Sequence, residues 1–153
     1  MTKDFTLQPL VNLAHQKNDA ATRKFGQLTQ QQQIALAKLD TLLQYRKDYQ
    51  ARFRDAVQTG MSQPDLHNFQ NFMLRLDEAI AQQQKVVEQA HNSVRVGRDE
   101  LEDTQRKMKS FDTLAQRHFE NEKKLEAKSE QRLQDEHTGR HATLKAASAE
   151  SES

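Results

Sequence analysis

Apolar residues recur in this chain at alternating spacings of four and three, in two long series with one interruption. The first series runs from Leu7 to Ala56 and the second from Leu66 to Ala115. A seven-residue repeat places an apolar stripe along a helix, and a stripe sustained for about seven heptads is typical of a coiled coil. Only 35% of the residues are hydrophobic and 29% are charged. Because so few apolar residues cannot fill a thick globular core, long helices that bury them along one seam are favoured.

The interruption lies between Gln58 and Pro64, where Gly and Pro fall close together. Gly60 can take the left-handed conformation that ends a helix. Ser62 has the features of an N-cap, with Pro64 in the first turn and Asp65 three residues on. The sequence therefore predicts an all-α hairpin with a first helix at about 7–58, a turn at 59–62 and a second helix at about 63–136.

The two stripes also predict how the helices pair, because a short loop places Ala56 opposite Leu66. Phe53 then faces Phe69, Phe25 faces Gly97, and the polar Asn18 faces Thr104. Large residues thus meet small ones, as a thin seam requires. A shift by one heptad would need a loop of about sixteen residues, and no loop-like sequence is present to form it. We expect a long antiparallel coiled coil, with Lys17 near Glu100 on its flank.

Three polar residues interrupt the first stripe, and the second stripe fades before its helix ends. Asn18, Gln32 and Arg46 recur at one heptad position and are expected to fix the register at a cost in stability. After Ala115 the stripe positions become polar, so the second helix is expected to extend beyond its partner. Residues 1–6 are predicted to be a flexible N-terminus and residues 137–153 a disordered tail.

The sequence contains no pattern typical of an enzyme, a metal site or a nucleic-acid-binding surface. Lys plus Arg number 23 against 22 Asp plus Glu, with the signs interspersed, so no basic stripe is available for phosphates. Only His137 and His141 have the helical spacing of metal ligands, and they lie in the weak tail. No phosphate-binding loop or activated nucleophile is recognisable, so no catalysis and no cofactor are expected. Without Cys or an apolar run of about 20 residues, we expect a soluble intracellular protein.

Apolar residues also flank the stripes in the half of the hairpin near the turn. Tyr45, Phe72, Ala79 and Val86 lie on one side, and Leu36, Leu43 and Val57 lie on the other. These residues could widen a thin core. They could also form an exposed surface for a partner, which is favoured because a two-stranded hairpin cannot bury both flanks.

At these positions the chain resembles the FliJ family of flagellar type III export proteins. The resemblance rests on the spacing of Leu39, Leu42, Tyr45 and Tyr49 before the turn, and on the stretch 68–72 followed by Leu76, Ala79 and Ile80 after it. It covers roughly residues 5–120 and keeps its spacing across the turn.

The resemblance implies a non-enzymatic coiled-coil stalk, similar to the central stalk of rotary ATPases, that serves flagellum assembly and motility. Its open end would enter the ring of the export ATPase FliI, and it would also contact the export gate protein FlhA and the flagellar export chaperones. The implied location is cytoplasmic, at the inner face of the membrane. A virulence-type secretion stalk and a parallel homodimeric scaffold are the alternatives, and the turn and the complementary stripes speak against the scaffold.

The resemblance also implies two partner-binding surfaces. The surface for the gate is made of Leu42, Tyr45, Tyr49, Phe72, Leu76 and Ala79. Lys38 and Gln83 flank it, at positions where other members are expected to have Gln and His. The surface for the ATPase is expected at the open end and comprises Leu7, Leu10, Leu114, Phe119 and Leu125.

Overall fold

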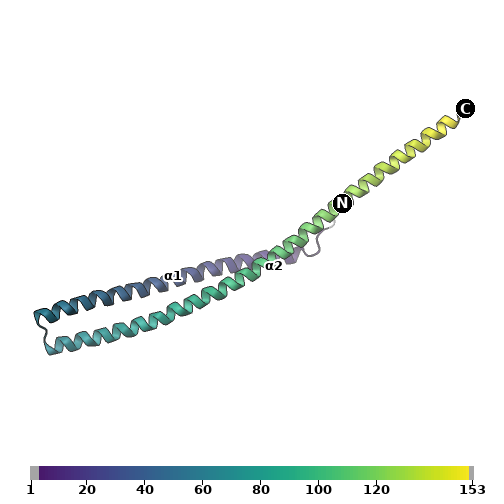
Figure 1. The fold of residues 1–153 in the computed structure, drawn as a ribbon. Helices are drawn as coiled ribbons and strands as arrows, with labels where there is room; N and C mark the ends of the chain where they lie inside the picture. Colours follow the sequence, from purple (N-terminus) through teal and green to yellow (C-terminus); the bar gives the residue numbers. More distant parts are fainter. Residues whose placement is uncertain (1–3, 152–153) are drawn as a thin grey trace. The chain divides into compact units, whose positions relative to one another are not determined.

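The computed structural model of the chain describes residues 4–151. In this part of the chain two helices, α1 (Gln8–Thr59) and α2 (Gln63–Ser151), run antiparallel and are joined by a short turn, with no strand (Figure 1). The predicted class, an all-α antiparallel hairpin, is thereby confirmed. The hairpin is formed within one chain and does not match the parallel homodimeric alternative.

The turn is built by the residues that the sequence singled out. Gly60 has a φ of 96°, in the left-handed region that favours glycine, and its N–H donates to the carbonyl of Val57 at 3.3 Å. Ser62 then caps α2, because its Oγ accepts a hydrogen bond from the backbone N–H of Asp65 at 3.3 Å. The carboxylate of Asp65 in the first turn of α2 is also favourable beside the positive end of the helix dipole.

The chain divides into two compact units, and each contains parts of both helices. One unit is formed by residues 17–104 and includes the turn, and the other is formed by the residues up to 16 together with those from 105 onward. We refer to them as the turn unit and the end unit.

The seam of the turn unit has the predicted register. The rings of Phe53 and Phe69 lie 4.5 Å apart, and Thr104 Oγ1 donates to Asn18 Oδ1 at 3.3 Å. Between these two levels, Ala35, Leu76, Ile80 and Val94 are at most 7% exposed. The helices approach so closely at Gly97 that a Cβ atom there would lie 2.7 Å from Leu28 Cδ1, with Phe25 Cδ2 at 3.7 Å. Large residues therefore face small ones, as predicted.

Each polar residue of the first stripe finds a partner on the opposite helix. Besides Asn18 with Thr104, Gln32 Nε2 lies 3.2 Å from His91 Nδ1, and Arg46 Nε donates to Asp77 Oδ1 at 2.6 Å. The hydrogen bond and the charge of Asp77 raise the pKa of the Arg46 guanidinium. A pKa raised by folding means that this interaction is fully present below the ordinary pKa of arginine and is lost only at still higher pH. The three pairs favour one register, because a slipped helix would separate them.

One ion pair joins the two helices on the flank where Lys17 was predicted to lie near Glu100. Glu100 Oε2 lies 3.2 Å from the Nζ atom of Lys24 and not from that of Lys17, which is one heptad earlier on the same flank of α1. Lys17 lies near Glu100, since both line one surface hollow together with Lys24.

In the end unit, the first turns of α1 pack against α2. Val11 and Ala14 are buried, and His15 Nε2 lies 2.7 Å from Asp112 Oδ1. Before α1, the ring of Phe5 lies 5.2 Å from that of His118, so residues predicted to be flexible make a tertiary contact. Residues 1–3 of that predicted N-terminus lie outside the described part of the chain.

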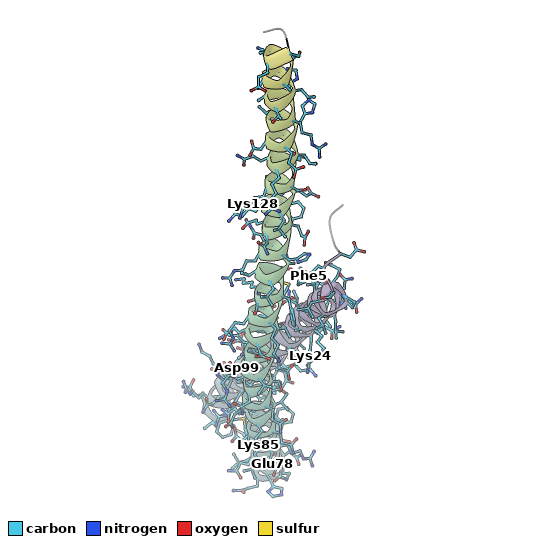
Figure 2. The ribbon with its side chains drawn as sticks, turned by 90° about the vertical axis from the view of Figure 1, so that its right-hand side faces the viewer. Phe5, Lys24, Glu78, Lys85, Asp99 and Lys128 are labelled. Carbon is cyan, nitrogen blue, oxygen red and sulfur yellow. The ribbon has the colours of Figure 1, made fainter. Side chains whose placement is uncertain are left out.

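The structure differs from the sequence prediction at the C-terminal end, where α2 continues to Ser151 instead of ending near Glu136. Every residue from 127 to 151 is exposed, including Lys128, which Figure 2 shows on a stretch of α2 with side chains projecting around it. The physical reason is local propensity: Ala, Leu, Lys and Glu favour helix, and Gly139 opposes it by only about 1 kcal/mol. No packing stabilises this stretch, and residues 152–153 of the predicted tail lie outside the described residues.

Candidate functional site

Five aromatic rings form a continuous cluster on the turn unit. Tyr49 of α1 stacks on Phe69 at 4.1 Å and lies 4.3 Å from Phe72, both on α2. Phe53 extends the cluster toward the turn, and Tyr45 extends it away from the turn, with ring centroids 6.0 Å from Phe72. Contacts at these distances fix ring orientations beyond what burial alone achieves. The cluster therefore presents a preorganised aromatic surface.

The six residues predicted for this site lie together but differ in exposure. Tyr45 is 51% exposed and is the most accessible of them, and Leu42, Tyr49, Phe72 and Ala79 are half-buried. Leu76 is only 6% exposed and belongs to the seam. A partner could therefore not reach Leu76 without parting the helices.

A shallow groove of about 660 Å³ continues from the aromatic cluster away from the turn. It shares Leu42 and Ala79 with the predicted site. The lining residues are Ile34, Ala37, Lys38, Thr41, Leu42, Ala79, Gln82, Gln83 and Val86. Gln83 is tied to the seam, because its Nε2 donates to the carbonyl of Ala35 at 2.9 Å. The groove thus has a fixed floor between the helices and forms one surface with the aromatic cluster.

The sequence pattern missed Ile34 as a member of this surface. Ile34 is 55% exposed, and its heptad position is one that normally faces solvent. The sequence did offer one signal for Ile34: it is a β-branched aliphatic residue at a position where a polar one is usual, one helical turn before Lys38. Val86, which the flank pattern did identify, lines the groove from α2 and is 45% exposed.

The opposite flank is also apolar and exposed, but its aliphatic residues do not line this groove. Leu36, Leu43 and Val57 are between 44% and 52% exposed. Their exposure shows that they do not widen the core, which was one of the two interpretations of the flanking residues. They provide a matched comparison for the aromatic surface, since they lie on the same hairpin without rings.

The second set of predicted site residues belongs to the end unit, and all five are accessible. Leu7, Leu10 and Leu114 are about two fifths exposed, and Phe119 and Leu125 are more than half exposed. Lys123 Nζ lies 5.4 Å from the centroid of the Phe119 ring, within the range of a cation–π contact. These residues form no ring cluster comparable to that of the turn unit.

The groups gathered on the two surfaces are mainly apolar and aromatic. Within residues 4–151, no three His, Cys, Asp or Glu side chains come together as a metal site would require. Neither helix, over the same residues, is long and apolar enough to cross a membrane. An aromatic cluster with an adjoining groove can bind the apolar face of another protein.

Comparison with known proteins agrees with the resemblance seen in the motifs. The family model described as "Flagellar FliJ protein" matches residues 2–146. The flagellar FliJ protein of Escherichia coli (strain K12) is 23% identical over 145 residues, which cover 95% of this chain and 99% of the relative. The flagellar FliJ protein of Salmonella typhi is 24% identical with the same coverage. Because the family model spans nearly the whole of a chain that folds as a helical hairpin, this protein belongs to the FliJ family.

Proposed function

We propose that this chain is a non-enzymatic component of the flagellar protein export apparatus, in which it links the export ATPase ring to the membrane export gate. The observation that carries the proposal is the aromatic cluster around Tyr49, Phe69 and Phe72, together with membership of a flagellar family. A rigid apolar surface that the fold leaves accessible is suited to a partner protein. The family model favours the flagellar system over a virulence-type one.

In this proposal the gate protein FlhA binds the aromatic surface through Leu42, Tyr45, Tyr49, Phe72 and Ala79. Tyr45 and Phe72 are its central contacts, since their rings meet at 6.0 Å across the two helices and Tyr45 is half exposed. Aromatic side chains at the centre of an interface commonly dominate its affinity. Leu76 contributes by holding the floor of the surface.

The end unit is proposed to bind the export ATPase FliI. Five exposed apolar residues give this unit a surface that a groove in the ATPase ring could bind. They are Leu7, Leu10, Leu114, Phe119 and Leu125. We also propose that the chain assists the flagellar export chaperones. Its place would be cytoplasmic, held at the inner face of the membrane by the export complex.

The gate surface is tested by the double substitution Tyr45→Ala with Phe72→Ala. Purified wild type and variant are compared for binding to the cytoplasmic part of FlhA, and cells carrying each are compared for swimming and flagellar secretion. We expect binding to weaken by roughly thirtyfold or more, because two central rings are each worth about 1–2 kcal/mol or more. Swimming and secretion should fall together.

The matched control is Leu36→Ala with Leu43→Ala, which removes two exposed aliphatic side chains from the opposite flank. This variant should bind the gate and swim like the wild type. Circular dichroism should show unchanged helicity in both variants. Normal swimming of the Tyr45/Phe72 variant would contradict the gate assignment, and equal defects in both variants would mean that the aromatic flank has no special role.

A further inference from the structure

The groove next to the aromatic cluster carries a single charged side chain. Of its nine lining residues, only Lys38 carries a charge. Five of the others are aliphatic, and Thr41, Gln82 and Gln83 are neutral. The Gln83 amide already donates to the carbonyl of Ala35. The groove is therefore an apolar surface with one ammonium group at it.

Lys38 has no counter-charge among the described residues. Its side chain forms no ion pair or hydrogen bond there, and its neighbours one turn away on α1 are the apolar Ile34 and Leu42. Two other cations of the turn unit pair across the helices, Lys24 with Glu100 and Arg46 with Asp77. Lys38 thus differs from them by leaving its charge to solvent.

A partner that covers the groove must therefore supply hydrogen-bond acceptors for the ammonium group of Lys38. Covering it with apolar groups alone would remove its water and supply no acceptor, which strongly disfavours binding. A carboxylate in the partner would restore the hydrogen bonds and pair the charge, while the aliphatic stem of the lysine can pack with apolar groups. The groove and its charge together select a partner segment of a definite kind.

We propose that the groove binds an apolar segment of the export gate protein that carries an Asp or Glu, and that this carboxylate pairs with Lys38. This inference rests on the proposed function, because the gate protein is the partner named there. The occupant is the gate protein because the groove and the gate surface are one continuous face that shares Leu42 and Ala79. Lys38 then determines which sequences the face accepts.

The test measures the Kd between the full chain and the purified cytoplasmic part of FlhA, at low and at high NaCl concentration. Three variants change one exposed side chain: Lys38→Glu reverses the charge, Lys38→Gln removes it and Lys38→Arg keeps it. The matched control is Lys85→Glu, because Lys85 directly precedes the groove residue Val86 on α2 but does not line the groove. Circular dichroism checks that all variants stay helical.

We expect Lys38→Gln to weaken binding about threefold to tenfold and Lys38→Glu by more, with Lys38→Arg within about twofold of wild type. The difference between wild type and Lys38→Gln should shrink at high salt, because salt screens an ion pair. Lys85→Glu should bind like the wild type. This pattern would support the pairing, since a loss of packing would not follow the sign of the charge.

Three outcomes overturn the inference. If Lys38→Glu binds like Lys85→Glu while the Tyr45/Phe72 variant loses binding, the pairing fails and the proposed function stands. If the wild type does not bind the gate fragment, both fail. If sedimentation velocity shows that the free chain is a dimer and that Lys38→Glu separates it, the occupant is a second copy of this chain and not the gate protein.

Discussion

Gly97 lies in the seam at a point of close helix approach, whereas Gly26 does not. A Cβ atom on Gly97 would lie 2.7 Å from Leu28 Cδ1, closer than packed carbon atoms come, and at van der Waals distance from Phe25. Gly26 follows Phe25 on α1 and has no atom within 4 Å of its Cβ position. The same residue type therefore has a packing role at one position and only a helix-weakening effect at the other.

The first prediction is that substitutions at these two glycines act in opposite directions. Gly26→Ala should raise the free energy of unfolding by roughly 0.5–1 kcal/mol, because alanine favours helix and meets no neighbour. Gly97→Val should lower it by roughly 1–3 kcal/mol, since a branched side chain must displace Leu28 and Phe25. Urea unfolding followed by circular dichroism measures both. A stabilising Gly97→Val would contradict the close approach.

Tyr45 illustrates what a single position in the heptad pattern can and cannot reveal. It lies beside the seam, where charge is usual, and an aromatic residue at such a position is conspicuous in the sequence alone. Its 51% exposure and its contact with Phe72 were decided by packing between the helices. Leu76 lies in the seam series of the second helix, where burial is expected, and it is only 6% exposed.

At the scale of the elements, the register of α1 against α2 follows from the cross-helix contacts of the turn unit. Because the chain has no cysteine, the register can be tested by introducing pairs. Oxidation should close a disulfide in the variant Ala35→Cys with Val87→Cys, which the register places opposite each other. It should not close in Ala35→Cys with Val94→Cys, where the second cysteine lies one heptad, about 10 Å, further along α2. Mobility on non-reducing gels under denaturing conditions distinguishes the two. Equal crosslinking would mean that the helices slip.

The last part of α2 is an element without packing. A helix whose side chains are all exposed depends on propensity alone, and about 25 residues of it are marginally stable in water. We expect hydrogen exchange in residues 127–151 to be fast, with little protection, while residues 17–104 exchange slowly. Mass spectrometry of peptides from both regions measures the difference. Strong protection of residues 127–151 would contradict this expectation.

At the scale of the whole molecule, the two proposed surfaces belong to different compact units. The gate surface lies in the turn unit, and the proposed ATPase surface lies in the end unit. Substitutions in residues that share no partners usually act independently. A two-ended linker therefore predicts that each surface can be lost without the other.

Independent loss can be measured with two variants and two partners. Leu114→Ala with Phe119→Ala and Leu125→Ala should weaken binding to the export ATPase, because apolar contacts are removed, and should leave gate binding unchanged. The Tyr45/Phe72 variant should behave in the opposite way. Leu133→Ala with Leu144→Ala serves as the control, since both leucines are exposed on α2 outside the predicted surface. Loss of both activities in one variant would argue against two separate surfaces.

Much of the fold was predictable because each step rests on local physics. The stripes of period seven define which residues meet, Gly60 and Ser62 define the turn, and a short loop leaves one register with complementary sizes. Phe53 with Phe69 and Asn18 with Thr104 confirm it. In a thin two-helix structure the packing partners follow directly from the turn, so few alternatives remain.

Only the tertiary structure decided how the surface is shaped. The sequence marked Tyr45, Phe72, Ala79 and Val86 as unusual, but it could not show that Ala79 and Val86 line one groove with Ile34 and Lys38. Exposure and groove shape depend on the distance between two helices and on side-chain directions, which no periodicity contains. The sequence by itself determined the hairpin and its register, because these follow from repeat and turn. The binding face was decided by the packing of the two helices side by side.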